Sequence, residues 1–286
     1  MPFVYDSAKL KDGESHLDLL YKDPATEFVD SVKNRLDLYT PGGTDWPVLV
    51  FAHGGGWSSG DKALTVGGKE VYRNIGRYFA ERGIGTAVIN YRLLPGVHWR
   101  TQINDVAAAI EWTYRHAPAY GGDTTRFFVS GHSAGAHLVA RTATDPEPLR
   151  ARGASKSIID GVISVSGGGY DMTDSTTYAL GAEFEYLEER YGVVDKSGDW
   201  VAGASVVQFV DAASPPMLFF AGGKEHPSFE RQARLMMKKL EENGIVTEFY
   251  PVKGATHPYM ILRMSKDGNA LTDHALRFIR ETPPSR

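Results

Sequence analysis

The chain has 286 residues, which is long enough to bury a large core, and 42% hydrophobic with 23% charged residues is an ordinary globular composition. A formal net charge of −4 and the lack of a long basic run argue against a nucleic-acid-binding surface. Because the sequence contains no cysteine, disulfides, thiolate metal sites and a cysteine nucleophile are excluded.

The N-terminal sequence shows no basic segment followed by an apolar core, so we expect no secretory signal. No window approaches the roughly 20 apolar residues that a membrane span requires. We therefore expect a cytoplasmic protein with neither a membrane nor a nucleic acid as its partner. The sequence does not determine the oligomeric state, and we consider a homodimer as one possibility.

Residues 1–45 are polar and mixed, and within this N-terminal extension NRLDLYTP predicts one antiparallel edge strand. Beyond it, short apolar runs alternate with longer amphipathic segments. The runs are nearly continuously hydrophobic and rich in Val, Ile and Phe, which is typical of strands in a parallel sheet covered on both faces. They predict strands at residues 47–53, 86–91, 126–132, 160–167, 216–222 and 247–253.

Apolar residues spaced by three and four predict helices over residues 102–116 and 228–242. Strands that alternate with helices imply right-handed crossovers. We therefore predict the α/β class, as a single domain over residues 1–286 with a mostly parallel, doubly wound sheet and helices on both faces. Residues 168–213 interrupt the alternation and include a predicted short helix at 183–191; we interpret this long excursion as a lid or cap.

The sequence GHSAG follows the strand predicted at residues 126–132 and precedes a helical segment. A serine nucleophile on a tight strand-to-helix turn needs small neighbours, and Gly131 and Gly135 lie two residues to either side of Ser133. The N-terminus of the helix also favours developing negative charge. We predict that Ser133 is a nucleophile; the alternative is that small residues at a helix start only allow close packing.

The sequence HGGGW, residues 53–57, ends another predicted strand. Acyl transfer needs backbone N–H groups aimed at one developing oxyanion, and side chains would obstruct that approach. We predict that the N–H groups of Gly54, Gly55 and Ala134 form an oxyanion hole, whereas a merely flexible turn is the alternative for the glycines.

Nine histidines compete for the role of general base. His257 follows the last predicted strand, at the end of a parallel sheet where catalytic groups gather. The proline after it is expected to keep the backbone extended rather than helical. We predict His257 as the base.

These residues carry a family resemblance. HGGGWSSGDK, NYRL, GGDTTRFFVSGHSAGAHL and the late THP together resemble an α/β-hydrolase of the esterase group over residues 45–280. More narrowly, GHSAGAHL and KEHPSFERQA are similar to kynurenine formamidase-like (arylformamidase-like) esterases. In that branch an acidic residue precedes a Pro, a Phe and an Arg-Gln pair, so the resemblance places Glu225 at the acid position.

A triad needs a carboxylate that orients the histidine, and in this fold the chain order is Ser, acid, His. Glu225 directly follows a buried predicted strand, so we predict a triad of Ser133, Glu225 and His257. Asp171, after SGGGY, is the second candidate for the acid. Trp57, Tyr91 and Tyr170 are predicted to line the substrate pocket, with ordinary packing as the alternative.

Together these features predict a serine hydrolase that cleaves carboxylic esters of short acyl groups through an acyl-enzyme, with a small-molecule ester or formamide as its partner. No metal and no organic cofactor is expected. Two alternatives stay open. One is an arylformamidase acting on N-formylkynurenine-like formamides, and the other is a catalytically silent ligand receptor on the same fold.

Overall fold

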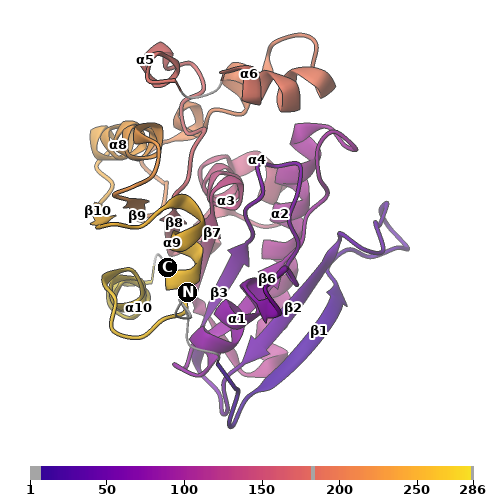
Figure 1. Cartoon of the computed structure of the whole chain (residues 1–286). Coiled ribbons are helices and arrows are strands. Elements are labelled where there is room, and N and C mark those ends of the chain that lie inside the picture. Colours follow the sequence, from indigo (N-terminus) through magenta and orange to yellow (C-terminus); the bar gives the residue numbers. More distant parts are fainter. Residues whose placement is uncertain (1–7, 182–183, 285–286) are drawn as a thin grey trace.

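A twisted, mostly parallel sheet forms the centre of the molecule (Figure 1). The computed structural model describes residues 8–181 and 184–284. The start of the predicted N-terminal extension, residue 183 of the predicted cap helix and the last two residues of the predicted domain lie outside them. Among the described residues, the sheet has eight strands in the order β1 (Glu14–Leu20), β2 (Arg35–Thr40), β6 (Gly85–Ile89), β3 (Trp46–Ala52), β7 (Gly122–His132), β8 (Gly161–Val165), β9 (Met217–Gly222) and β10 (Thr247–Val252).

Neighbouring strands from β6 to β10 are parallel, and β2 runs antiparallel to both β1 and β6. The predicted doubly wound α/β fold is therefore confirmed. The edge prediction for NRLDLYTP is wrong, because β2 lies second in the sheet and β1 covers it. The sequence of β1, ESHLDLL, has mostly exposed or half-buried side chains, so it lacks the apolar run that marks the other strands. The short strands β4 (Thr65–Val66) and β5 (Lys69–Glu70) pair separately.

Helices pack on both faces of this sheet. The predicted helices 102–116 and 228–242 lie within α2 (Trp99–His116) and α8 (Pro227–Glu242), which cover one face together with α3 (Ala134–Thr144). The opposite face is covered by α1 (Tyr72–Ala80), α9 (His257–Arg263) and α10 (Ala270–Glu281), while α4 (Pro146–Arg150) extends the chain after α3.

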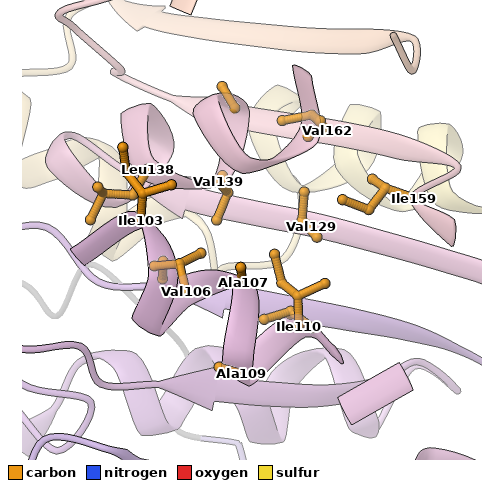
Figure 2. Close-up of a cluster of buried hydrophobic side chains, with 14 of the residues drawn as sticks. Ile103, Val106, Ala107, Ala109, Ile110, Val129, Leu138, Val139, Ile159 and Val162 are labelled. Atoms are coloured by element: carbon orange, nitrogen blue, oxygen red, sulfur yellow. The ribbon is translucent and has the colours of Figure 1, made fainter. Parts of the chain in front are cut away.

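The alternation of side chains along β3 assigns the two faces. Val48 and Val50 belong to the core under α2 and α3, whereas Leu49 and Phe51 belong to the core under α1. Figure 2 shows part of the first core, in which apolar side chains of α2 and α3 meet those of β7 and β8. Each fully buried side chain of this size contributes about 1.5–3 kcal/mol of hydrophobic stabilisation. These two cores hold rigid the strand ends from which the site is built.

The excursion predicted at residues 168–213 leaves the sheet after β8 and returns only at β9. We call these residues the cap. Its described residues form short helices: α5 (Ser175–Ala179), α6 (Phe184–Leu187), a π-helical turn (Glu188–Gly192), α7 (Trp200–Gly203) and a 3-10 turn (Val206–Phe209). In Figure 1 α5 and α6 stand beyond α8 and α3, at the top of the view. Among the described helices, none combines the length and the apolar composition that crossing a bilayer takes.

Candidate active site

Ser133 stands on the sharp turn between β7 and α3. Its backbone has φ 54° and ψ −120°, a conformation that residues other than glycine rarely adopt. A Cβ atom on Gly131 would lie 2.4 Å from the carbonyl carbon of Gly135, and one on Gly135 would lie 2.3 Å from the oxygen of Ala52. The two glycines of the motif are therefore the residues that let α3 start directly above β7 and β3.

His257 and Glu225 meet above the ends of β9 and β10. The Nδ1 atom of His257 donates to Oε1 of Glu225 over 2.9 Å, and Oε2 of Glu225 accepts the N–H of Gly222 over 2.6 Å. The carboxylate side chain is only 1% exposed, whereas the imidazole side chain is 29% exposed. With its proton on Nδ1, the ring keeps a lone pair on Nε2 that can accept a proton.

The backbone at His257 differs from our prediction. His257 is the first residue of α9, not part of an extended loop. The proline that follows is tolerated there because the N–H it lacks would have no partner in the first helical turn. The prediction located the residue correctly at the strand end but gave it the wrong local conformation.

Two aromatic rings fix the position of the His257 side chain. Phe229 of α8 stacks on it with ring centroids 4.4 Å apart, and the ring of His132 lies 4.8 Å away. Nε2 of His132 donates to the carbonyl oxygen of His257 over 3.2 Å. Burial, together with the nearby imidazole, lowers the pKa of His132 to about 3, so this ring remains a neutral support.

Asp171, the second candidate for the acid, has different partners. Its Oδ1 accepts the N–H and the hydroxyl of Thr173 over 2.9 and 2.5 Å, and its own N–H donates to Gln232 over 2.8 Å. Asp171 therefore shapes a turn at the start of the cap, while the Nδ1 atom of His257 is bonded to Glu225.

A cavity of about 540 Å³ opens over Ser133. Ala134, Glu225 and His257 also line it, and most of its remaining wall comes from the cap and from α8. The apolar part of this wall includes Trp57, Met172, Tyr178, Tyr186, Leu187 and Phe229. The residues predicted from GHSAG, KEH and THP are thus brought to one pocket.

Of the three aromatic residues predicted to line the pocket, only Trp57 does so. Tyr91 is fully buried, where it stacks on His53 and donates its hydroxyl to the carbonyl oxygen of His53 over 2.8 Å. Tyr170 is also fully buried and shares a hydrogen bond with Ser164. Both predictions are wrong for the same reason: these rings fill the space beneath the loops, where they support the backbone.

The first glycine of HGGGW has a partner inside the protein. The N–H of Gly54 donates to the hydroxyl of Tyr72 in α1 over 3.0 Å, so this N–H is not available to a substrate. The carbonyl oxygen of Gly54 accepts from Nδ1 of His53 over 2.7 Å, and burial lowers the pKa of that imidazole to about 4. The prediction of Gly54 as an oxyanion donor is therefore contradicted.

The third glycine of the motif, Gly56, is better placed. The carbonyl oxygen of Gly55 accepts the N–H groups of Ser58 and Ser59 over 3.2 and 2.9 Å. In a trans peptide the N–H points opposite to the carbonyl, so the N–H of Gly56 is directed away from these serines. Gly56 lines the cavity together with Ala134. Gly56 thus replaces Gly54 in the candidate set, beside Gly55 and Ala134.

Known proteins resemble the chain over most of its length. Esterase LipC from Mycobacterium tuberculosis is 29% identical over 94% of this chain and 65% of its own length. Esterase B from Lactobacillus rhamnosis superposes with a TM-score of 0.73 at 23% identity, covering 96% of this chain and 87% of that one. A propionate-bound thermophilic esterase from Thermogutta terrifontis has a TM-score of 0.67 at 26% identity, covering 96% and 94%.

The chain spans about half to two-thirds of the length of the first curated relatives that it matches. The structural matches share the arrangement of sheet and helices described above, and the strand-to-helix turn with its serine lies inside the region that a family model describes. That model, BD-FAE, matches residues 36–240, which is more than half of the chain, and the chain therefore belongs to the BD-FAE family.

Proposed function

We propose that this chain is a carboxylic ester hydrolase that works through a serine nucleophile and an acyl-enzyme. The observation that carries the proposal is the 2.9 Å bond from His257 to the buried carboxylate of Glu225, in a cavity that Ser133 also lines. A carboxylate in this place holds one tautomer of the imidazole and stabilises its charged form. The esterase names of the relatives agree with this reaction class.

In the acylation half-reaction, Oγ of Ser133 attacks the ester carbonyl carbon while Nε2 of His257 takes the hydroxyl proton. The carbonyl oxygen becomes an oxyanion that accepts from the N–H groups of Gly56 and Ala134, with Gly55 beside them. When the carbon–oxygen bond to the alcohol breaks, His257 gives its proton to the leaving oxygen. The acyl group then remains bonded to Ser133.

In the second half-reaction, water attacks the acyl carbon and loses a proton to His257, and the same N–H groups stabilise the second oxyanion. Collapse of this intermediate releases the carboxylic acid, and the proton returns from His257 to the serine oxygen. The net change is one ester plus one water to one acid plus one alcohol.

We propose short acyl groups as the preferred substrates. A solved relative at 26% identity holds propionate, a three-carbon acid. In this chain the cap lines the cavity, and Trp57 and Met172 add bulky side chains to the wall of the cavity that Ser133 also lines. A series of p-nitrophenyl esters of increasing acyl length measures this preference directly. A kcat/KM that rises steadily with acyl length would contradict it.

The triad is tested with matched substitutions. Ser133→Ala should lower kcat for p-nitrophenyl acetate by about 10⁵-fold or more, and Glu225→Gln by about 10³- to 10⁴-fold. Asp171→Asn, a carboxylate from the same cavity, is the matched control and should retain most activity. If Asp171→Asn is inactive and Glu225→Gln is not, the acid is misassigned.

Measurements on the same protein samples distinguish ester hydrolysis from two other candidate functions. An arylformamidase would use the same groups on a formamide carbonyl. The resemblance of KEHPSFERQA suggests this second candidate, and Phe229 of that segment packs on His257. Turnover of N-formylkynurenine well above that of p-nitrophenyl acetate would establish it. A ligand receptor would fold normally, yet Ser133 would fail to react with a fluorophosphonate probe.

A further inference from the structure

The π-helical turn of the cap contacts the loop formed by HGGGW, residues 53–57, which we call the glycine loop. Nε of Arg190 donates to the carbonyl oxygen of Gly56 over 3.0 Å. Nη1 of the same guanidinium donates to the carbonyl oxygen of Tyr186 over 3.1 Å, and its central carbon lies 3.3 Å from the centroid of the Tyr186 ring. Tyr186 of α6 therefore holds Arg190 in a fixed orientation. At the same time Arg190 bonds a peptide more than a hundred residues earlier in the chain.

Gly56 is enclosed by the same two cap residues. A Cβ atom on Gly56 would lie 1.8 Å from the hydroxyl oxygen of Tyr186 and 3.6 Å from Nε of Arg190. The backbone at Gly56 has φ +57°, a region that favours glycine. The loop and the cap thus fit against one another at this point without space for a side chain.

The peptides on both sides of Gly56 have separate anchors. The carbonyl of Gly55, before it, is bonded by Ser58 and Ser59 of its own loop. The carbonyl of Gly56, after it, is bonded by Arg190 of the cap. The N–H of Gly56 lies in the peptide before it, the plane of which is held through the Gly55 carbonyl. The Arg190 bond holds the next peptide, so the two anchors together fix φ and ψ of Gly56. Because glycine rotates freely, release of the Arg190 bond would let these angles change and the N–H of Gly56 turn.

The positive charge of Arg190 suits a position beside a site where negative charge develops. Its side chain is 22% exposed, and among the described residues the carboxylate found near it is that of Glu189 at 3.9 Å. Glu189 is 77% exposed, so water screens this pair and it neutralises little of the guanidinium charge. A hydrogen bond from a charged donor is stronger than one from a neutral donor.

We propose that Arg190 is a positioning residue for the oxyanion hole: by bonding the carbonyl of Gly56 it fixes the peptide after that residue, and through the φ and ψ angles of Gly56 it restrains the preceding peptide, the N–H of which faces the developing negative charge. The proposal rests on the proposed ester hydrolysis. It assigns to the cap a role in the chemical step, in addition to that of covering the substrate.

The test compares Arg190→Gln, Arg190→Lys and the wild type with p-nitrophenyl acetate. Loss of one whole oxyanion donor lowers kcat about 10²- to 10³-fold, so a misdirected donor in Arg190→Gln should lower it about 10- to 100-fold, with KM nearly unchanged. Arg190→Lys keeps the charge but cannot make both guanidinium bonds, and its kcat should fall between the two. The rate of fluorophosphonate labelling should fall in the same order, because the phosphoryl oxygen occupies the oxyanion hole.

Lys196→Gln is the matched control, since it removes an exposed cation of the same cap. Thermal unfolding of each variant checks that the fold is kept, and Arg190→Lys carries the test if Arg190→Gln cannot be isolated folded. An unchanged kcat in the Arg190 variants, or a loss confined to KM, would overturn the proposal while wild-type turnover leaves the proposed function standing. A wild type that neither turns over esters nor reacts with the probe would instead refute the proposed function itself.

Discussion

At the scale of single residues, the glycine loop shows what a motif leaves open. Its three glycines look equivalent in the sequence, but the structure gives them different surroundings. The N–H of Gly54 is taken by Tyr72, whereas Gly56 lines the cavity. A hydrogen bond from outside the motif takes the Gly54 N–H, which is why this predicted donor is wrong.

Tyr72→Phe tests the internal anchor of this loop. The change removes the acceptor of the buried Gly54 N–H, and an unsatisfied buried donor costs about 1–3 kcal/mol. The loop can avoid this cost only by turning, so we expect a lower kcat as well as a lower free energy of unfolding. Urea unfolding and steady-state kinetics measure the two effects.

Tyr78→Phe is the control on the same helix, because the Tyr78 hydroxyl bonds Asp267 away from the site. It should lose stability and keep kcat. Equal kcat values for both variants and the wild type would show that Tyr72 does not set the loop.

At the scale of elements, two adjacent residues of α8 fasten the start of the cap. Arg231 of α8 binds Asp174 through two bonds of 2.6 and 2.7 Å, which holds the pKa of that carboxyl far below its usual range. Gln232 bonds the backbone of Asp171 on both its N–H and carbonyl groups. The Arg-Gln pair of KEHPSFERQA thus anchors the start of the cap, a structural use that the sequence pattern alone could not distinguish from contact with a substrate.

The crossing of α3 over β3 is the element contact on which the nucleophile depends. In Gly135→Ala the new methyl group would lie 2.3 and 2.4 Å from two carbonyl oxygens of the strand end, so α3 must move away. We expect a loss of about 3 kcal/mol, the upper part of the usual range for overpacking, together with a large loss of activity. Gly96→Ala, at an exposed turn where the methyl group meets only one atom at 3.4 Å, should change stability by less than about 1 kcal/mol. Urea unfolding measures the stability of both variants. If Gly135→Ala and Gly96→Ala have similar free energies of unfolding, α3 does not cross β3 as closely as described.

At the scale of the whole molecule, the sequence predicts what repeated patterns encode. Buried parallel strands and amphipathic helices recur along the chain, so the sheet, its two helical layers and the residues at its strand ends could be predicted. Three kinds of feature could not. The polar strand β1 has no apolar run, Tyr91 and Tyr170 look like any aromatic residue near a strand end, and the Arg190 contact joins segments 134 residues apart, as counted from Gly56 to Arg190.

Buried histidines make the free energy of unfolding depend on pH, and the direction of this dependence follows from their pKa shifts. Burial lowers the pKa of His53 and His137 to about 4 and that of His132 to about 3, whereas in the unfolded chain each is near its ordinary value of about 6.5. The unfolded state therefore binds more protons as the pH falls below about 6.5, and the stability present above that pH is lost. Each proton contributes at most about 1.4 kcal/mol per pH unit. Urea unfolding between about pH 6.5 and pH 5, above the range in which most carboxylates titrate, should show a falling free energy of unfolding.

A matched pair of variants assigns this slope. His137→Gln should remove about a third of it, because one of the three buried imidazoles no longer titrates in the unfolded chain. His116→Gln replaces an exposed histidine and should leave the slope as it is in the wild type. A wild-type free energy of unfolding that stays constant over this interval would mean that the three rings accept protons without unfolding. In that case the description of His53, His132 and His137 as neutral rings in the folded protein would have to be revised.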